Sequence, residues 1–146
     1  MSAHRALVTG LTAVFLAACS DLRFTTAVNT IEVPITTPSW QLDIAPILGE
    51  TCATSGACHG GANAALGLNL EPGQSYASAV NVASQARPAF LRVKPGQADS
   101  SFLYLATSSV VAERQSYFRM PLTEYPLPDP VRQSIRNWIN NGAPNN

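Results

Sequence analysis

Cys52-Ala-Thr-Ser-Gly-Ala-Cys58-His59 is the stretch on which the fold of this 146-residue chain depends. On either side of it lie short segments with helical periodicity, separated by long connections rich in Gly and Pro. Short helices joined by connections of about fifteen residues or more bury too little side-chain surface to hold a small domain together. We therefore expect a disulfide or a bulky cofactor at the centre, and this stretch carries the groups to attach either one.

Four helices are predicted around this stretch, over residues 43–52, 75–80, 99–109 and 129–140. In the first, Asp43 is the predicted N-cap and Pro46 falls in the first turn, where its missing N–H costs nothing. The last is the clearest, because Asp129 is a natural N-cap and Pro130 takes the first helical position. Its apolar residues recur at helical spacing and are Val131, Ile135, Trp138 and Ile139. The expected fold is all-α, a small domain of three or four short helices with long loops.

Residues 1–18 have the character of a secretory signal peptide, with a short basic start at Arg5 followed by an apolar run. They end in Leu16-Ala17-Ala18-Cys19, which resembles a bacterial lipobox. The resemblance implies cleavage before Cys19, lipidation of its thiol and amino group, and, with Ser20 following, sorting to the outer membrane of the cell envelope. We expect three regions: a signal peptide (1–18), a lipidated extended tether (19–39) that includes a short strand over 31–35, and a domain (40–146).

The charge balance excludes some function classes. The 9 basic and 9 acidic residues give no net charge, whereas nucleic-acid binding requires a basic surface. Beyond the N-terminus there is no apolar run of 18 residues, so no later segment is expected to span a membrane. After processing only one histidine, His59, remains, and with no paired acidic motif either, a hydrolase has little support.

Two thiols and an imidazole directly after the second of them suit one covalently bound haem c. Its attachment needs two thiols that add to the porphyrin vinyl groups and an imidazole directly after the second thiol to reach the iron. Cys58 and His59 are adjacent, and Cys52 is the second thiol available. Met120, the one methionine left after processing, lies in a Pro-rich loop and is the candidate for the sixth iron ligand, as in His/Met cytochromes. Two alternatives stay open: Cys52 and Cys58 form a disulfide, and Met120 packs in the core.

Six motifs in a fixed order also resemble the cytochrome c-like domains of bacterial exported lipoproteins. They cover about residues 42–143 and are Cys58-His59-Gly60-Gly61, Gly67-Leu68-Asn69-Leu70, Arg92-Val93-Lys94-Pro95-Gly96, Ser101-Phe102-Leu103-Tyr104, Arg119-Met120-Pro121 and Trp138-Ile139-Asn140-Asn141-Gly142-Ala143. The resemblance implies that the first and last helices cross beside the haem, with His59 as proximal and Met120 as distal ligand. The usual motif has two residues between the cysteines; this chain has five, and Gly56 is expected to let the extra residues bulge.

Two functions are therefore expected from the sequence. The first is a membrane-anchored monohaem cytochrome that transfers single electrons between redox proteins of the envelope and catalyses no reaction of its own. The second is a haem-free lipoprotein module, held by a Cys52–Cys58 disulfide, that uses the same fold for binding.

Overall fold

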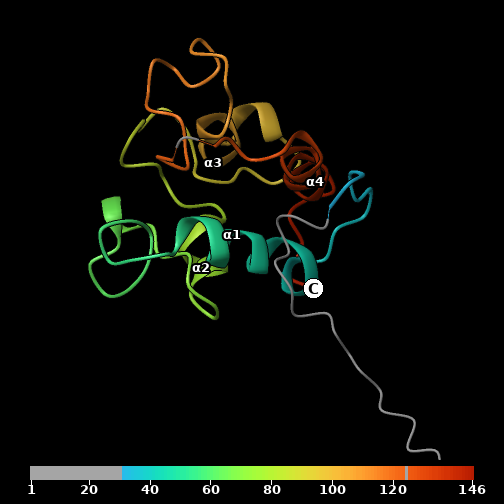
Figure 1. Cartoon of the computed structure of the whole chain (residues 1–146), viewed down its shortest axis with the longest axis horizontal. Helices are drawn as coiled ribbons and strands as arrows, with labels where there is room; N and C mark the ends of the chain where they lie inside the picture. The colour runs from blue at the N-terminus through green and yellow to red at the C-terminus, as the bar shows by residue number, and fades with distance from the viewer. Residues whose placement is uncertain (1–30, 124) are drawn as a thin grey trace, which may run out of the picture.

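The computed structural model describes residues 31–123 and 125–146 (Figure 1). This part of the chain has no strand and folds into four α-helices: α1 (Ala45–Cys52), α2 (Ser75–Ala79), α3 (Phe102–Ala106) and α4 (Asp129–Asn140). Single turns of other helix types complete it: η1 (Trp40–Ile44), η2 (Ala65–Gly67) and η3 (Ala98–Ser100). The predicted all-α class is thus confirmed. The expected signal peptide and Cys19 lie outside the described residues, within which no helix is long and apolar enough to cross a membrane.

The first helix begins earlier than predicted. Ser39, not Asp43, caps it: the Ser39 hydroxyl accepts a hydrogen bond from the Leu42 N–H at 3.3 Å. The Asp43 carboxylate accepts in return from the Ser39 N–H at 2.8 Å, so the two side chains cap the turn reciprocally. The π-helical turn η1 therefore precedes α1 and buries Trp40 and Ile44. This extension matters because η1 is the part of the first helical segment that packs against α4.

The last helix has the buried face that was predicted, but its cap was wrong: Asp129 is the first helical residue, and Pro128 takes the N-cap position with no side-chain hydrogen bond. Val131, Ile135, Trp138 and Ile139 are fully buried. Gly142 adopts a left-handed backbone conformation, at φ 95°, and ends the helix. Because each of these signals is local in sequence, α4 is predictable without knowledge of the rest of the fold.

The third helix is shorter than the predicted 99–109 segment. Ser101 interrupts it with an extended backbone, at ψ 110°. The Ser101 hydroxyl accepts a hydrogen bond from the Lys94 N–H at 2.8 Å and donates to the Gln97 C=O at 2.8 Å. Ser101 is fully buried and also pairs with Leu91 in an isolated β-bridge. These contacts to the preceding connection replace the helical continuation and leave η3 and α3 as separate elements.

Residues 31–39, the last part of the expected tether, lie against α4 and contain no strand. The Ile35 N–H donates to the Ser134 hydroxyl at 2.9 Å, and the Asn137 side-chain amide donates to the Ile35 C=O at 2.8 Å. Asn141 likewise donates to the Thr36 C=O at 3.0 Å. The polar side of α4, which the amphipathic pattern assigns to solvent, thus binds this segment.

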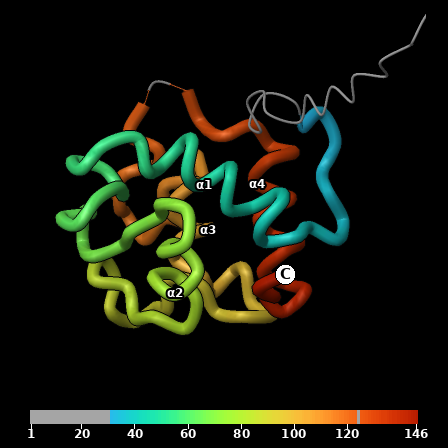
Figure 2. The backbone as a smooth tube through the Cα atoms, turned by 90° about the horizontal axis from the view of Figure 1, so that it is seen from below, coloured from blue at the N-terminus to red at the C-terminus, as the bar shows by residue number. Residues whose placement is uncertain are grey.

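The two ends of the domain meet beside the aromatic part of the core. The Asn146 C=O accepts hydrogen bonds from the Gln41 N–H at 2.9 Å and the Ser39 hydroxyl at 2.8 Å. The Asn146 side chain accepts from the Trp40 N–H at 2.9 Å. Next to these bonds the Trp40 and Trp138 rings pack at 4.8 Å. Figure 2 shows the result, with α4 running alongside the first helical segment.

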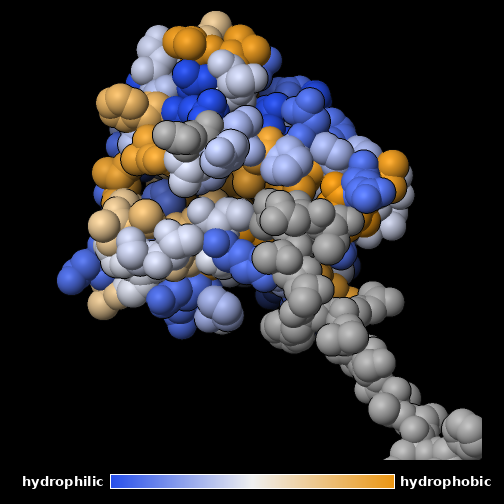
Figure 3. All heavy atoms as spheres, in the orientation of Figure 1, coloured by the Kyte–Doolittle hydropathy of each residue, from blue (hydrophilic) through white to orange (hydrophobic). Residues whose placement is uncertain are grey.

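The connection between α3 and α4 stays irregular, as predicted, and forms a protruding loop (Figure 1). Apolar side chains gather at the top of the space-filling view, over this loop (Figure 3). Its exposed large apolar residues are Val110, Val111, Phe118, Leu122 and Tyr125. The same connection carries Met120, whose side chain is half-buried and packs against the core.

Candidate functional site

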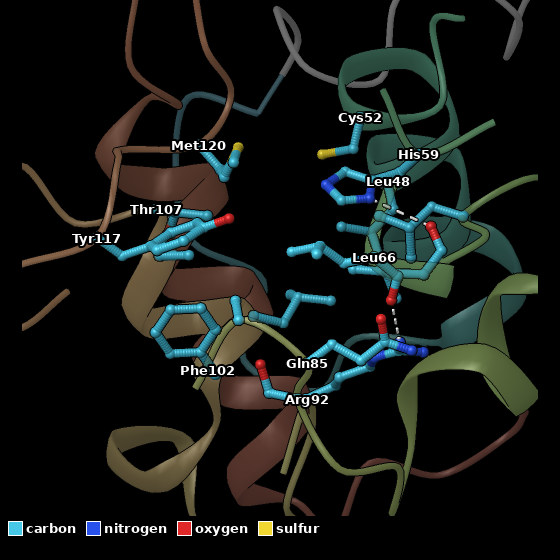
Figure 4. A pocket seen from close by; sticks show the side chains of 16 residues that line it. Leu48, Cys52, His59, Leu66, Gln85, Arg92, Phe102, Thr107, Tyr117 and Met120 are labelled. Carbon is cyan, nitrogen blue, oxygen red and sulfur yellow. Dashed lines mark hydrogen bonds between the residues drawn. The ribbon is translucent and has the colours of Figure 1, made fainter. Parts of the chain in front are cut away.

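A cavity of about 70 Å³, partly open to solvent, separates two halves of the domain. One wall is formed by α1 and the loop after it, and the other by α3 and the segment from Tyr117 to Met120 (Figure 4). Most of the lining side chains are apolar, among them Leu48, Leu68 and Phe102. Apolar walls with a few placed polar groups are typical of cofactor sites in proteins. This cavity has such walls, and it occupies the centre where the sequence predicts a cofactor or a disulfide.

His59 lies on the first wall with its ring held in one orientation. Its Nδ1 is 3.2 Å from the Leu68 C=O, and because a carbonyl can only accept, Nδ1 carries the proton. The other ring nitrogen, Nε2, is then free of a proton and has a lone pair to donate. Burial lowers the pKa of His59 below its usual value of 6.5, so the imidazole is neutral at pH 7. A backbone carbonyl partner of this kind is what fixes a metal-binding histidine.

Met120 lies on the opposite wall. Figure 4 shows its side chain and the His59 ring extending into the cavity from opposite sides. The Met120 N–H donates to the Ala106 C=O of α3 at 2.8 Å, so the backbone holds this residue in place independently of its sulfur. His59 and Met120 are separated by 61 positions in the sequence, yet the fold directs both side chains into one cavity.

Cys52 lines the cavity at the same end as His59 and Met120 (Figure 4). The five-residue spacing to Cys58 is closed by the backbone, because the His59 N–H donates to the Cys52 C=O at 3.0 Å. This bond brings the two ends of the loop together and keeps Cys52 beside His59. The Cys52 side chain is half-buried, and burial raises the pKa of its thiol.

Of the four residues predicted to hold haem, Cys58 is the one whose side chain is outside the cavity lining. Its thiol is exposed to solvent, and both Cys52 and Cys58 are free thiols in the structure. Hydrogen bonds from the Ser55 and Thr54 side chains lower the pKa of the Cys58 thiol. The structure therefore groups Cys52, His59 and Met120, and leaves Cys58 next to His59 in sequence but facing solvent.

The close approach in this loop occurs at Gly60 and not at Gly56, where it was expected. Gly56 adopts no left-handed conformation, and a Cβ there would have open space around it apart from one atom at 3.9 Å. A Cβ on Gly60 would lie 2.7 Å from the Ala53 C=O oxygen and 3.3 Å from that of Ser55. Real Cβ atoms essentially never come within 3.0 Å of another heavy atom. Gly60 is therefore required so that the loop between the cysteines can fold back on the backbone after His59.

The opposite end of the cavity holds polar groups that sequence reasoning did not assign to the site. Arg92 and Gln85 line it there, away from Cys52 and Met120 (Figure 4), and Ser84 is a further polar residue of the lining. Arg92 belongs to the Arg-Val-Lys-Pro-Gly motif, one of the six motifs on which the resemblance rests. Nothing in that motif indicates that the guanidinium is buried. Tyr117 and Phe102 also line the cavity, with ring centres 5.5 Å apart in an edge-to-face arrangement.

The donor set fits haem c better than a bare metal ion. An imidazole nitrogen and a thioether sulfur on opposite walls match the axial ligands of a His/Met haem, and Cys52 supplies a thiol at the edge of the same space. Within residues 31–123 and 125–146, no three His, Cys, Asp or Glu side chains form a group that could hold a metal ion by themselves. Comparison of the chain with family models, with curated proteins and with solved structures finds no match.

Proposed function

We propose that this chain is a lipid-anchored c-type cytochrome with one covalent haem, which transfers single electrons in the bacterial cell envelope and is not an enzyme. The observation that carries the proposal is the placement of the His59 imidazole and the Met120 thioether on opposite walls of one apolar cavity. Two such ligands separated by a gap with apolar walls are what a flat macrocycle with a central iron requires.

Haem bound in the cavity would supply an iron that is oxidised and reduced by one electron at a time. His59 would hold the iron through Nε2, with its ring fixed by the Leu68 C=O. Met120 would supply a soft thioether, which favours the ferrous state and so a high potential. The apolar walls would reduce the number of water molecules near the iron and so limit solvent reorganisation when its charge changes.

Cys52 and Cys58 are the proposed sites of thioether attachment. Cys52 already lines the cavity, whereas the Cys58 side chain is exposed to solvent and would have to turn toward the cavity for attachment. Cys58 directly precedes His59, as the second cysteine of a c-type haem motif precedes its histidine. We therefore assign Cys58 the larger contribution and Cys52 the smaller one.

The lipid anchor and the envelope location are supported by the sequence alone. They rest on the apolar run and the Leu16-Ala17-Ala18-Cys19 lipobox, which lie outside the described residues. Acyl chains on Cys19 hold a protein on a membrane because each buried methylene contributes about 0.8 kcal/mol. The partners expected for such a domain are other redox proteins of the envelope, met on the periplasmic or outer surface, and not nucleic acid.

Haem staining and the visible spectrum test the proposal directly. The full chain, produced in a host with a cytochrome c maturation system, should be red and should keep its haem stain after denaturing electrophoresis. Cys58→Ser should abolish the stained band, and Cys52→Ser should leave a weaker one. A colourless protein with a Cys52–Cys58 disulfide would instead support the haem-free binding module.

Met120→Ala tests the distal ligand, with Leu122→Ala as its control. Leu122 is two residues away in the same segment and its side chain is 73% exposed, so its removal leaves the cavity unchanged. Met120→Ala should retain covalent haem, lose the near-infrared sulfur-to-iron band of the oxidised protein and bind carbon monoxide. If Met120→Ala and Leu122→Ala have the same spectrum as the wild type, Met120 packs in the core and is not a ligand.

A further inference from the structure

The connection between α3 and α4 exposes an apolar surface that the proposed function leaves unused. Within residues 31–123 and 125–146, eight large apolar side chains are exposed, and five of them belong to this connection. These five, which we call the apolar patch, are Val110, Val111, Phe118, Leu122 and Tyr125. Apolar side chains gather over this connection at the top of Figure 3. Single exposed apolar residues are common, but a concentration of them on one segment marks an interaction surface.

Hydrogen bonds hold the middle of this connection in a fixed shape. The Arg114 guanidinium donates to the Ser108 C=O at 2.6 Å and to the Tyr117 C=O at 3.0 Å. Arg87, from the connection after α2, donates to the Gln115 C=O at 2.8 Å, and its guanidinium lies over the Tyr117 ring. Because these bonds give the loop its shape before any partner binds, docking of the apolar patch costs little conformational entropy.

The charges of this connection cancel. Residues 110–125 contain two basic and two acidic side chains, so the segment carries no net charge. A protein partner that is steered by charge needs a surface of one sign. A lipid bilayer needs only apolar side chains that enter it, and amphipathic rings such as Tyr125 lie at the level of the headgroups. The composition therefore favours a lipid surface over a charged protein.

The described chain begins at the end of the domain where this connection enters α4. The Ile35 N–H donates to the Ser134 hydroxyl, whereas the Thr36 C=O accepts from Asn141, farther along the helix. Residues 31–36 thus run in the same direction as α4, and the residues before Ile35 lie toward its start at Asp129. Figure 2 shows the blue start of the described chain and the orange-red segment that leads into α4 at the same end of the domain.

The proposed lipid anchor lies within a short reach of this end. An extended chain advances about 3.3–3.6 Å per residue, so the segment between Cys19 and Ile31 spans about 40 Å at most. Acyl chains on Cys19 therefore keep the domain beside the bilayer, with the end that receives the connection nearest to the anchor. Such a tether makes contact with the membrane an intramolecular event, so a modest apolar surface is enough for docking.

We propose that the apolar patch inserts into the surface of the membrane to which the chain is anchored. This rests on the lipid anchor of the proposed function, and it does not depend on the haem. The polar backbone of the loop and its charged side chains limit the insertion to the interface, to a depth of about 5–10 Å. Met120 lies between Phe118 and Leu122 in the same segment, so the insertion orients the domain with this wall of the cavity toward the lipid.

A tryptophan in the apolar patch tests the proposal in the full, lipid-anchored chain. Phe118→Trp places the reporter at a side chain that is 71% exposed. Leu42→Trp is the matched control, because Leu42 is 79% exposed and lies in η1, beside the C-terminus. The buried Trp40 and Trp138 give the background, which is measured in the unsubstituted chain. Fluorescence is compared in phosphatidylcholine vesicles with and without bromine on the acyl chains, so that any quenching by haem is common to both.

A photoreactive lipid gives a second readout that needs no substitution. The unsubstituted chain is irradiated in vesicles that contain a diazirine-bearing phosphatidylcholine, and the labelled peptides are identified by mass spectrometry. Label is expected in residues 110–125 and not in residues 40–52. If Phe118→Trp does not accumulate, this measurement decides.

The expected result is that brominated lipid causes a loss of emission in Phe118→Trp, while Leu42→Trp stays at its level in plain vesicles. Added phosphatidylglycerol should not change this loss, because the segment is neutral. Equal emission ratios for the two variants, with no label in residues 110–125, would overturn this proposal and leave the anchor and the cytochrome standing. A dimer in detergent with the same unlabelled segment would assign the apolar patch to a second copy of the chain. Quenching that requires phosphatidylglycerol would assign the contact to charge and overturn apolar insertion. A chain without acyl groups that does not sediment with vesicles would overturn both this proposal and the lipid anchor.

Discussion

Alanine at Gly60 should damage the loop that positions His59, while leaving every ligand in place. The added Cβ would lie 2.7 Å from the Ala53 C=O oxygen, which must retreat by about 0.7 Å to reach ordinary contact at 3.4 Å. The Cβ would also lie 3.3 Å from the Ser55 C=O oxygen, which accepts hydrogen bonds from the N–H groups of Cys58 and Gly60. Both contacts are with backbone, so no side chain can rotate away to relieve them.

The loss in the free energy of unfolding follows from the extent of this steric overlap. Overpacking a well-packed site typically costs about 1–3 kcal/mol in the free energy of unfolding. For a domain of this size each kcal/mol lowers the melting temperature by about 4 °C, so Gly60→Ala should melt about 4–12 °C lower than the wild type. Because the loop that moves joins Cys52 to His59, the fraction of chains with covalent haem should fall as well.

Gly49→Ala is the matched control, measured by the same thermal unfolding and haem staining. Gly49 lies inside α1, and a Cβ there would meet nothing within 4 Å. Alanine in a helix interior is more favourable than glycine by about 0.5–1 kcal/mol, so this variant should melt slightly higher and keep its haem. If the two variants melt alike and hold equal haem, the requirement for glycine after His59 is refuted.

Four further outcomes are expected. Cys19→Ala should leave an unprocessed precursor or release the protein from membranes, as detected by fractionation. Ile135→Ala, at a fully buried position of α4, should lower the free energy of unfolding by about 2–5 kcal/mol in urea titrations. Asp99→Asn removes the surface ion pair with Arg136 and should change that free energy by less than about 1 kcal/mol, because both side chains are substantially exposed. In haem-free chain, the free energy of unfolding should fall as the pH drops below 6.5, since burial lowers the pKa of folded His59 and the unfolded state then binds more protons.

Each of these has an outcome that contradicts it. Firm membrane attachment of Cys19→Ala would reject the lipobox, and a loss above 2 kcal/mol in Asp99→Asn would mean that the ion pair is not a simple surface contact. A cost below 1 kcal/mol for Ile135→Ala would contradict the burial of α4. His59→Gln is the control for the pH series, and an equal pH dependence in this variant would assign the effect to other groups.

The residues of the candidate site differ in how far the sequence could reveal them. Cys52, His59 and Met120 could be chosen because few thiols, imidazoles and thioethers exist in the processed chain, and each has specific chemistry. Arg92 could not be chosen from the sequence. Its burial depends on hydrogen bonds to the carbonyls of Leu66, Gly67 and Ser78, which lie in other segments of the chain. Charged residues are common and usually exposed, so nothing local distinguishes a buried arginine.

The helices show the same division between local and distant causes. The extent of α4 was predictable because its periodicity and the terminating glycine lie within the segment, although Pro128 and not Asp129 takes the N-cap position. The predicted 99–109 helix was wrong in extent because the Ser101 hydroxyl bonds to Lys94 and Gln97, which propensity and periodicity do not register. The early start at η1 had a local signal, Ser39 followed by Asp43, that could have been recognised as a reciprocal cap.

The hydrogen bonds from Asn146 to residues 39–41 have a consequence for protein engineering. Because these two ends of the domain touch, a few linking residues should suffice to join them covalently, and new ends could be opened in the protruding loop at 110–116. In such a circular permutant Met120 would come before Cys52 and His59 along the chain, although all three would still meet at the cavity. The order Cys-Cys-His-Met along the chain would then reflect only how the segments are connected. The geometry of the site does not require that order.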